Sequence, residues 1–172
     1  MAHFAQLVNA IAPIFTKQNG LFLQTIYHPL RLYAEHMQEI ALDVHVNGDT
    51  YDLPAAQETA SVGRVHHVSD LGPFQLLDAV ATCDDAGRAL TIAIVDHDHA
   101  RALTATVNLG GAPVSGAAEM WEVNGPDVGV TNSFETPRAV DVASQRVEMG
   151  GSRFDYTFPA HSITIVRTAV SR

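Results

Sequence analysis

The chain has 172 residues, of which 47% are hydrophobic and 17% are charged, and this balance is typical of a globular protein rather than a disordered one. The formal net charge of -9 argues against nucleic acid and anionic membranes as partners, because both surfaces repel an acidic protein. With Cys83 as the single cysteine, and neither a long apolar segment nor a signal-peptide pattern, we expect a cytoplasmic protein without an internal disulfide.

The first part of the chain predicts the order helix, strand, helix. Apolar residues recur at helical spacing over residues 2–16, so we expect an amphipathic helix that Pro13 kinks and the Asn-Gly pair at 19–20 ends. The short apolar run at 21–25 is consistent with a buried strand of a parallel sheet. A second apolar stripe predicts a helix over residues 29–38.

From about residue 41 onward, the pattern changes to the alternation that is typical of β-strands. The last strand breaks at Pro159, which cannot donate to a ladder, so two segments are expected to meet there at a corner. Residues 53–73 are polar and predict a long loop. Short strands with Gly, Pro, Asn and Asp between them indicate a mainly β fold, an antiparallel sandwich. The predicted strands cover residues 42–46, 76–83, 89–95, 102–109, 117–123, 139–148 and 154–167.

Acidic residues occur in pairs, and glycoside hydrolysis needs two carboxylates at a fixed separation. Isolated acids are mostly exposed in proteins, and we therefore interpret these pairs as solvated surface groups. No catalytic dyad is predicted. The pairs are Glu35 with Glu39 on a helix, Asp84 with Asp85 in a hairpin turn, and Glu119 with Glu122 on a strand.

Residues 96–99 (DHDH) combine imidazole and carboxylate groups, which could suit zinc or another transition ion. Their spacing follows no standard structural site, and they fall between two predicted strands, so we prefer a polar loop. The pair at 66–67 (HH) is interpreted in the same way. His161 and Ser162 lack a nucleophile elbow, and adjacent strand residues point to opposite faces. We therefore predict no metal, no cofactor and no serine hydrolase chemistry.

Aromatic side chains leave two alternatives open. Trp121 and the alternating aromatics Phe154, Tyr156 and Phe158 could form a platform on which a sugar stacks. At a spacing of two in a sandwich, the same residues more often face the core, and this is the interpretation that we prefer.

Gln24 is the candidate binding residue. A polar side chain between an apolar strand and a helix occupies the place where α/β barrels put their ligand-binding groups. The alternative is a glutamine that caps a nearby backbone amide. Spacing alone leaves both interpretations open.

Four stretches resemble a known family and change how these features are weighed: residues 5–14 (AQLVNAIAPI), 24–29 (QTIYHP), 123–128 (VNGPDV) with 132–134 (NSF), and 158–164 (FPAHSIT). Together and in this order they resemble the C-terminal part of family 51 glycoside hydrolases, the retaining α-L-arabinofuranosidases. The resemblance implies that residues 1–39 are the end of a (β/α)8 catalytic barrel and that residues 40–172 form a jelly-roll-like β-sandwich. It also implies that Gln24 hydrogen-bonds arabinose beside the nucleophile.

The resemblance further implies what this sequence lacks. In family 51 the general acid and the nucleophile are glutamates on earlier barrel strands, and neither has a counterpart here, so the chain alone is expected to be inactive. It would then be a fragment, one half of a split enzyme, or a remnant that retains the sandwich.

Partners follow from the same resemblance. The full enzyme would bind an arabinofuranosyl oligosaccharide. A segment from its extreme N-terminus contributes to the sandwich, so we expect an open sheet edge here, covered by the missing barrel portion or by a homo-oligomer. The alternative function is a non-catalytic module for carbohydrate binding or oligomerisation.

Overall fold

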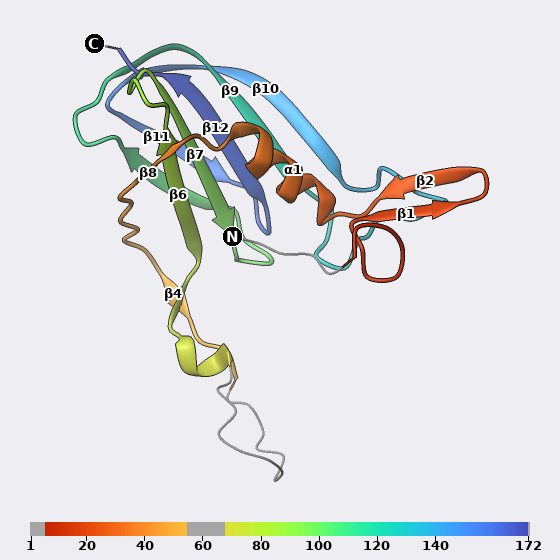
Figure 1. The fold of residues 1–172 in the computed structure, drawn as a ribbon. Coiled ribbons are helices and arrows are strands. Elements are labelled where there is room, and N and C mark those ends of the chain that lie inside the picture. Colours follow the sequence, from red (N-terminus) through yellow and green to blue (C-terminus); the bar gives the residue numbers. More distant parts are fainter. Residues whose placement is uncertain (1–5, 55–67, 172) are drawn as a thin grey trace.

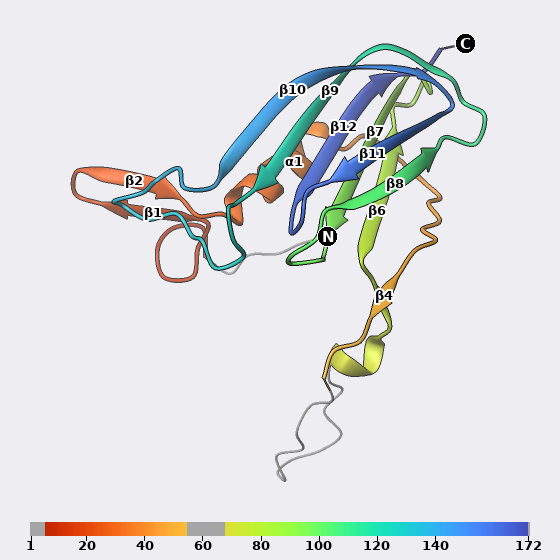
Figure 2. The same cartoon turned by 180° about the vertical axis from the view of Figure 1, so that it is seen from behind.

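Figures 1 and 2 show the computed structural model, which describes residues 6–54 and 68–171. Three layers are visible: one helix, a central antiparallel sheet, and a small second sheet. The helix is α1 (Tyr27–His36), and the second sheet pairs β8 (Leu103–Asn108) with β11 (Arg153–Phe158). The central sheet contains β3 (Ile40–Leu42), β6 (Leu77–Cys83), β7 (Ala89–Asp96), β9 (Val114–Asn124), β10 (Asp141–Gly151) and β12 (Ile163–Ala169).

The central sheet has the order β10-β9-β12-β7-β6-β3. Strand β12 therefore lies between two strands that come earlier in the chain, with Ile163 opposite both Val95 and Val123. Three shorter pieces lie outside these layers. They are the hairpin of β1 (Ile14–Lys17) and β2 (Gly20–Leu23), the pair β4 (Thr50–Tyr51) and β5 (Phe74–Gln75), and the 3-10 turn η1 (Val68–Leu71).

Helix α1 packs on one face of the central sheet through Leu32, which is buried against Ala93 and Ile165. Its C-terminal end is held by Gln38, whose backbone N–H donates to Thr82 Oγ1 at 2.9 Å and whose Nε2 donates to Thr91 Oγ1 at 2.9 Å. Because Thr82 lies on β6 and Thr91 on β7, the position of the helix is fixed relative to two strands.

The opposite face of the central sheet packs against β8 and β11. Phe158 is buried in a cluster with Leu90, Ile92 and Ile94, and the predicted break at Pro159 separates β11 from β12. Alternation on β11 therefore leaves Phe158 buried and Phe154 and Tyr156 half-buried, while the residues between them are exposed. The mainly β, antiparallel fold is confirmed.

The predicted helix over residues 2–16 is wrong in the part that the structure describes. Residues 6–13 are irregular, and Asn9 closes a local loop in which its Oδ1 accepts a hydrogen bond from Thr16 N at 2.8 Å. The Asn-Gly pair at 19–20 belongs to a hairpin turn, since Lys17 pairs with Gly20. Turns of this composition favour hairpins as much as helix ends. The following strand is consequently β2, antiparallel to β1, rather than a strand of a parallel sheet.

The second layer is narrower than a jelly-roll requires. In the described residues it contains two strands, whereas the central sheet has six. The difference leaves an apolar groove of about 960 Å³, here called the inner groove. The groove runs beside β8. Residues 42–46, which were predicted as a strand, line one wall of it, but the chain is irregular beyond Leu42. Its apolar lining includes Leu77, Leu90, Ile92, Ile94 and Val107.

In the described part of the chain, no helix combines the length and hydrophobicity needed to cross a bilayer.

Candidate functional site

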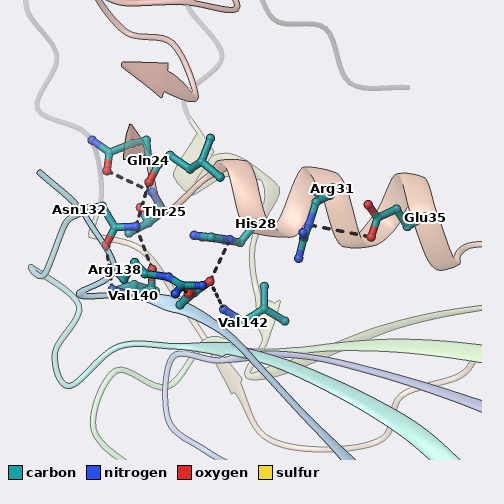
Figure 3. Close-up of polar contacts among 11 residues, drawn as sticks. Gln24, Thr25, His28, Arg31, Glu35, Asn132, Arg138, Val140 and Val142 are labelled. Carbon is teal, nitrogen blue, oxygen red and sulfur yellow. Dashed lines mark hydrogen bonds and ion pairs between the residues drawn. The ribbon is translucent and has the colours of Figure 1, made fainter. Parts of the chain in front are cut away.

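Gln24 lies between the end of β2 and the start of α1 (Figure 3). Its backbone is hydrogen-bonded on both sides, because Gln24 N donates to Pro13 O at 2.8 Å and Gln24 O accepts from Tyr27 N at 2.9 Å. The residue therefore has a fixed main-chain position at the junction of strand and helix.

The side chain of Gln24 is half-buried, and its Oε1 accepts a hydrogen bond from Thr25 N at 3.1 Å. This is the local capping contact that the sequence left open as an alternative. Gln24 Nε2 donates no hydrogen bond to another described residue. Both of its N–H groups are therefore available to donate to a ligand. The geometry is compatible with both roles at once: a cap through Oε1 and a donor to a ligand through Nε2.

Asn132 lies beside Gln24 on the loop between β9 and β10, and it is only 2% exposed. Its Nδ2 donates to Leu23 O and to Val140 O, both at 2.8 Å, and its Oδ1 accepts from Val140 N at 2.8 Å. Because buried polar groups are costly when unpaired, this fully bonded carboxamide ties the end of β2 to the start of β10.

A histidine and an ion pair complete the cluster in Figure 3. His28, in the first turn of α1, has Nδ1 at 3.8 Å from Asp141 Oδ1, and Arg138 Nε lies 2.7 Å from Asp141 Oδ2. Burial alone would raise the pKa of Asp141, but the hydrogen bond from Val142 N and the Arg138 guanidinium lower it overall. Asp141 is therefore an ionised, engaged carboxylate. It accepts a hydrogen bond from Arg138, whereas the 3.8 Å to His28 Nδ1 is beyond hydrogen-bond distance.

Chemically, the arrangement offers the N–H donors of one carboxamide and one carboxylate that is already engaged. In the described residues, no hydrogen bond joins two carboxyl groups, and the carboxylate of this cluster is already ion-paired. Retaining glycosidases use two carboxyl groups about 5 Å apart, one of them protonated. The cluster supplies an amide donor and a rigid frame for it.

The comparison with known proteins identifies the family. A model of the alpha-L-arabinofuranosidase C-terminal domain matches residues 1–162. The chain belongs to this family. The expected resemblance is confirmed, and the relatives found are arabinofuranosidases matched in their C-terminal part.

Two curated relatives illustrate the match of this arabinofuranosidase C-terminal domain. A probable alpha-L-arabinofuranosidase C of Aspergillus clavatus is 31% identical over 167 residues, which cover 97% of this chain and 30% of the fungal protein. The intracellular exo-alpha-(1->5)-L-arabinofuranosidase of Bifidobacterium longum is 30% identical over 145 residues, covering 79% of this chain and 23% of the bacterial one.

Solved structures agree. The alpha-L-arabinofuranosidase of Thermotoga maritima in its arabinose complex has a TM-score of 0.81 and 28% identity, covering 96% of this chain and 33% of that one. The thermostable GH51 alpha-L-arabinofuranosidase of Thermotoga petrophila has a TM-score of 0.79 and 28% identity, and the match covers 95% of this chain and 32% of that one. The domain thus spans a third or less of the length of these relatives.

The acidic residues predicted as solvated pairs lie in different surroundings. Asp84 Oδ1 accepts hydrogen bonds from Arg88 N and Ala89 N, as a turn residue does. The exposed Glu119 pairs with Arg146. Glu122 departs from the predicted solvated pair, since it is half-buried and burial raises its pKa.

Residues 96–99 form a connection at the end of β7, as predicted, although two of its side chains are buried. Asp98 organises it by accepting hydrogen bonds from the backbone of Ala100 and Arg101 and from Arg101 Nε, which lowers the pKa of Asp98 to about 2. Among the described residues, no three or more His, Cys, Asp or Glu side chains lie so that together they could hold a metal ion. The pair at 66–67 lies outside the described residues.

His161 and Ser162 stabilise the same end of the domain. Ser162 Oγ donates to Pro159 O at 2.7 Å, and the ring nitrogens of His161 lie 3.1 Å from His99 O and 3.0 Å from Gly125 O. Both side chains are occupied with backbone groups, and neither forms a nucleophile arrangement.

The aromatic side chains pack into the interior. Trp121 stacks on His36 of α1 with ring centroids 3.8 Å apart, and Tyr156 packs against Phe158 at 5.0 Å. Phe158 is buried, and Trp121 and Tyr156 are half-buried against the core clusters, which supports the core interpretation for these three residues.

Sequence reasoning missed Asn132 and His28. Asn132 lies within a stretch that the sequence shows as turn-forming, and a single asparagine in a loop gives no sign that it is buried. His28 follows the strand-helix junction, and its neighbour Asp141 is distant in the sequence.

His28 predicts how the stability of the domain depends on pH. Burial lowers its pKa from the ordinary value of 6.5, although Asp141 opposes the shift. The unfolded chain binds this proton more readily, so the contribution of neutral His28 is complete above about pH 6.5 and is lost as the pH falls below it. When the pH is lowered from about 7.5 to about 5.5, we expect the urea concentration at the unfolding midpoint to decrease. The decrease should be smaller in His28→Gln than in the unchanged chain. Equal decreases in both proteins would contradict this expectation.

Proposed function

We propose that this chain is the C-terminal portion of a retaining α-L-arabinofuranosidase that releases terminal arabinofuranose from glycans of the arabinan or arabinoxylan type. Residues 1–39 would be the end of the catalytic barrel, and residues 40–172 the sandwich that supports it. The name of the Bifidobacterium relative, an exo-acting enzyme on α-1,5-linked arabinofuranose, supports release from chain ends.

The observation that carries the proposal is the position of Gln24. Its main chain is held on both sides, its Oε1 is occupied, and its Nε2 keeps its donors. A carboxamide held in this way can donate to a hydroxyl group of the sugar with little loss of side-chain freedom. We therefore assign Gln24 to substrate binding and assign no residue of this chain to catalysis.

The catalytic carboxylates would come from a barrel portion that packs against exposed apolar residues near the N-terminus. Ile11 is 80% exposed, and it is one of five large apolar residues between positions 7 and 26 that are exposed, as is typical of a contact surface. We name this surface the N-terminal apolar patch; it comprises Leu7, Val8, Ile11, Leu21 and Ile26.

The inner groove is a second surface for association. In the described residues, β8 pairs with β11 alone, so one edge of β8 is open beside the groove. An extended segment could pair with this edge and place apolar side chains in the groove. We propose that the remainder of the enzyme, or a second copy in a homo-oligomer, supplies it.

We also propose an intracellular location. The Bifidobacterium relative is named as intracellular, and the lone cysteine makes no demand for an oxidising compartment.

Turnover measurements test the proposal. The purified chain is incubated with 4-nitrophenyl α-L-arabinofuranoside, alone and together with the polypeptide encoded directly upstream. We expect no release of nitrophenol by the chain alone and turnover on mixing, because both carboxylates are needed for the double displacement.

Two other results would change the conclusion. Turnover by the chain alone would refute the assignment of the catalytic carboxylates to another part of the enzyme. Binding of arabino-oligosaccharides in calorimetry, without turnover in any mixture, would favour a non-catalytic binding module instead.

A further inference from the structure

The loop between β9 and β10 reaches across to the β1–β2 hairpin through one buried side chain. Asn132 uses both hydrogens of Nδ2, one for Leu23 O and one for Val140 O, while Oδ1 accepts from Val140 N. Leu23 is 109 residues away from Asn132 in sequence. The contact therefore joins the two parts of the chain that we assign to the sandwich and to the barrel.

The carbonyl that Asn132 holds belongs to the peptide unit from which Gln24 begins. Leu23 O and Gln24 N are the two polar ends of this unit, and they bond to Asn132 Nδ2 and to Pro13 O, each at 2.8 Å. A peptide group is planar, so bonds at both ends fix its orientation. The bond from Tyr27 N to Gln24 O holds the following peptide as well, so the direction in which the Gln24 side chain leaves the backbone is set.

Packing keeps the loop in place around Asn132. The ring of Phe134 meets that of Phe22 on β2 edge to face, with centroids 4.8 Å apart, and Lys17 Nζ lies 4.2 Å from the centroid of the Phe134 ring. These contacts position the loop against both strands of the hairpin, while Asn132 supplies the hydrogen bond to the segment that carries Gln24.

We infer that Asn132 is a positioning residue of the sugar-binding site, through which the sandwich orients Gln24. The inference rests on the proposed function, because it assumes that Gln24 binds the sugar. An asparagine is required rather than an aspartate, since a carboxylate would place an oxygen against the carbonyls of Leu23 and Val140.

The test uses the active mixture of this chain and the barrel-containing polypeptide. Asn132→Asp and Asn132→Ala are each made alone and together with Gln24→Ala. We expect either change to lower kcat/KM roughly tenfold or more, since small errors in position are costly. With Gln24→Ala present, the same change should have less than about a twofold effect, because the group being positioned is absent.

Ser133→Ala is the matched control, because Ser133 bonds to Glu135 and Thr136 within the same loop. We expect it to leave kcat/KM unchanged. Equal losses from Asn132→Ala in both Gln24 backgrounds would show a structural role alone and would overturn the inference. So would unchanged kcat/KM for both Asn132 variants.

Hydrogen exchange separates this inference from the proposed function. In the 172-residue chain, the backbone N–H of Gln24 should exchange about tenfold faster in Asn132→Asp than in Ser133→Ala. If Gln24→Ala leaves turnover unchanged, the role of Gln24 is refuted, and exchange alone decides the positioning. Faster exchange then supports the positioning of the Gln24 backbone by Asn132, and unchanged exchange refutes it.

Discussion

Phe158→Ala should lower the free energy of unfolding by about 3–5 kcal/mol. The side chain is 1% exposed and lies between the two sheets, against Leu90, Ile92 and Ile94. Removing the ring leaves a cavity beside the inner groove and takes away the contact with Tyr156. Urea denaturation followed by circular dichroism measures the effect, with Phe158→Leu as a milder variant that should lose about 1–2 kcal/mol.

Phe154→Ala is the control for this measurement. Phe154 lies on the same face of β11 but is only half-buried, opposite Val107. We expect a loss of about 1–2 kcal/mol, in proportion to the smaller area that it buries. If both alanine variants lost the same amount, the contact between the two sheets would not be centred on Phe158.

Gln24→Ala should lower kcat/KM for arabinofuranosides roughly tenfold to hundredfold in the active mixture. Losing a hydrogen bond in a closed site costs about 1–3 kcal/mol, and each 1.36 kcal/mol corresponds to about a tenfold change. Gln24→Glu should be similarly impaired, because a carboxylate replaces the donor Nε2 with an acceptor.

Gln18→Ala serves as the matched control, since Gln18 is exposed in the turn between β1 and β2. It should leave kcat/KM unchanged. Thermal unfolding of all three variants shows whether the Gln24 effect is local. A loss of stability in Gln24→Ala without any loss of kcat/KM would leave the capping of Thr25 as the sole role of Gln24.

The sandwich strands could be predicted because alternation is a local signal. Pro159 marked the break between β11 and β12, and the turn after Cys83 marked that between β6 and β7. The order of the strands could not be predicted in the same way. Strand β12 inserts between β7 and β9, and pairings between distant segments leave no local pattern.

The first predicted helix shows where periodicity is ambiguous. Apolar residues at helical spacing also suit a loop that folds back on itself, and Asn9 satisfies the backbone of Thr16 in a way that spacing does not reveal. The site was partly accessible from sequence. Gln24 was found from its place between an apolar strand and a helix and was assigned a role through the family resemblance; that role stays a prediction, whereas Asn132 depends on partners far along the chain.

The N-terminal apolar patch and the inner groove are separate surfaces, one near the β1–β2 hairpin and one beside β8. A single polypeptide that covers both surfaces contacts this chain at two separate places. Release of one contact would leave the other attached, and rebinding would then be intramolecular and fast. If the barrel-containing polypeptide covers both surfaces, its mixture with this chain should dissociate very slowly on dilution, even if each contact alone is weak.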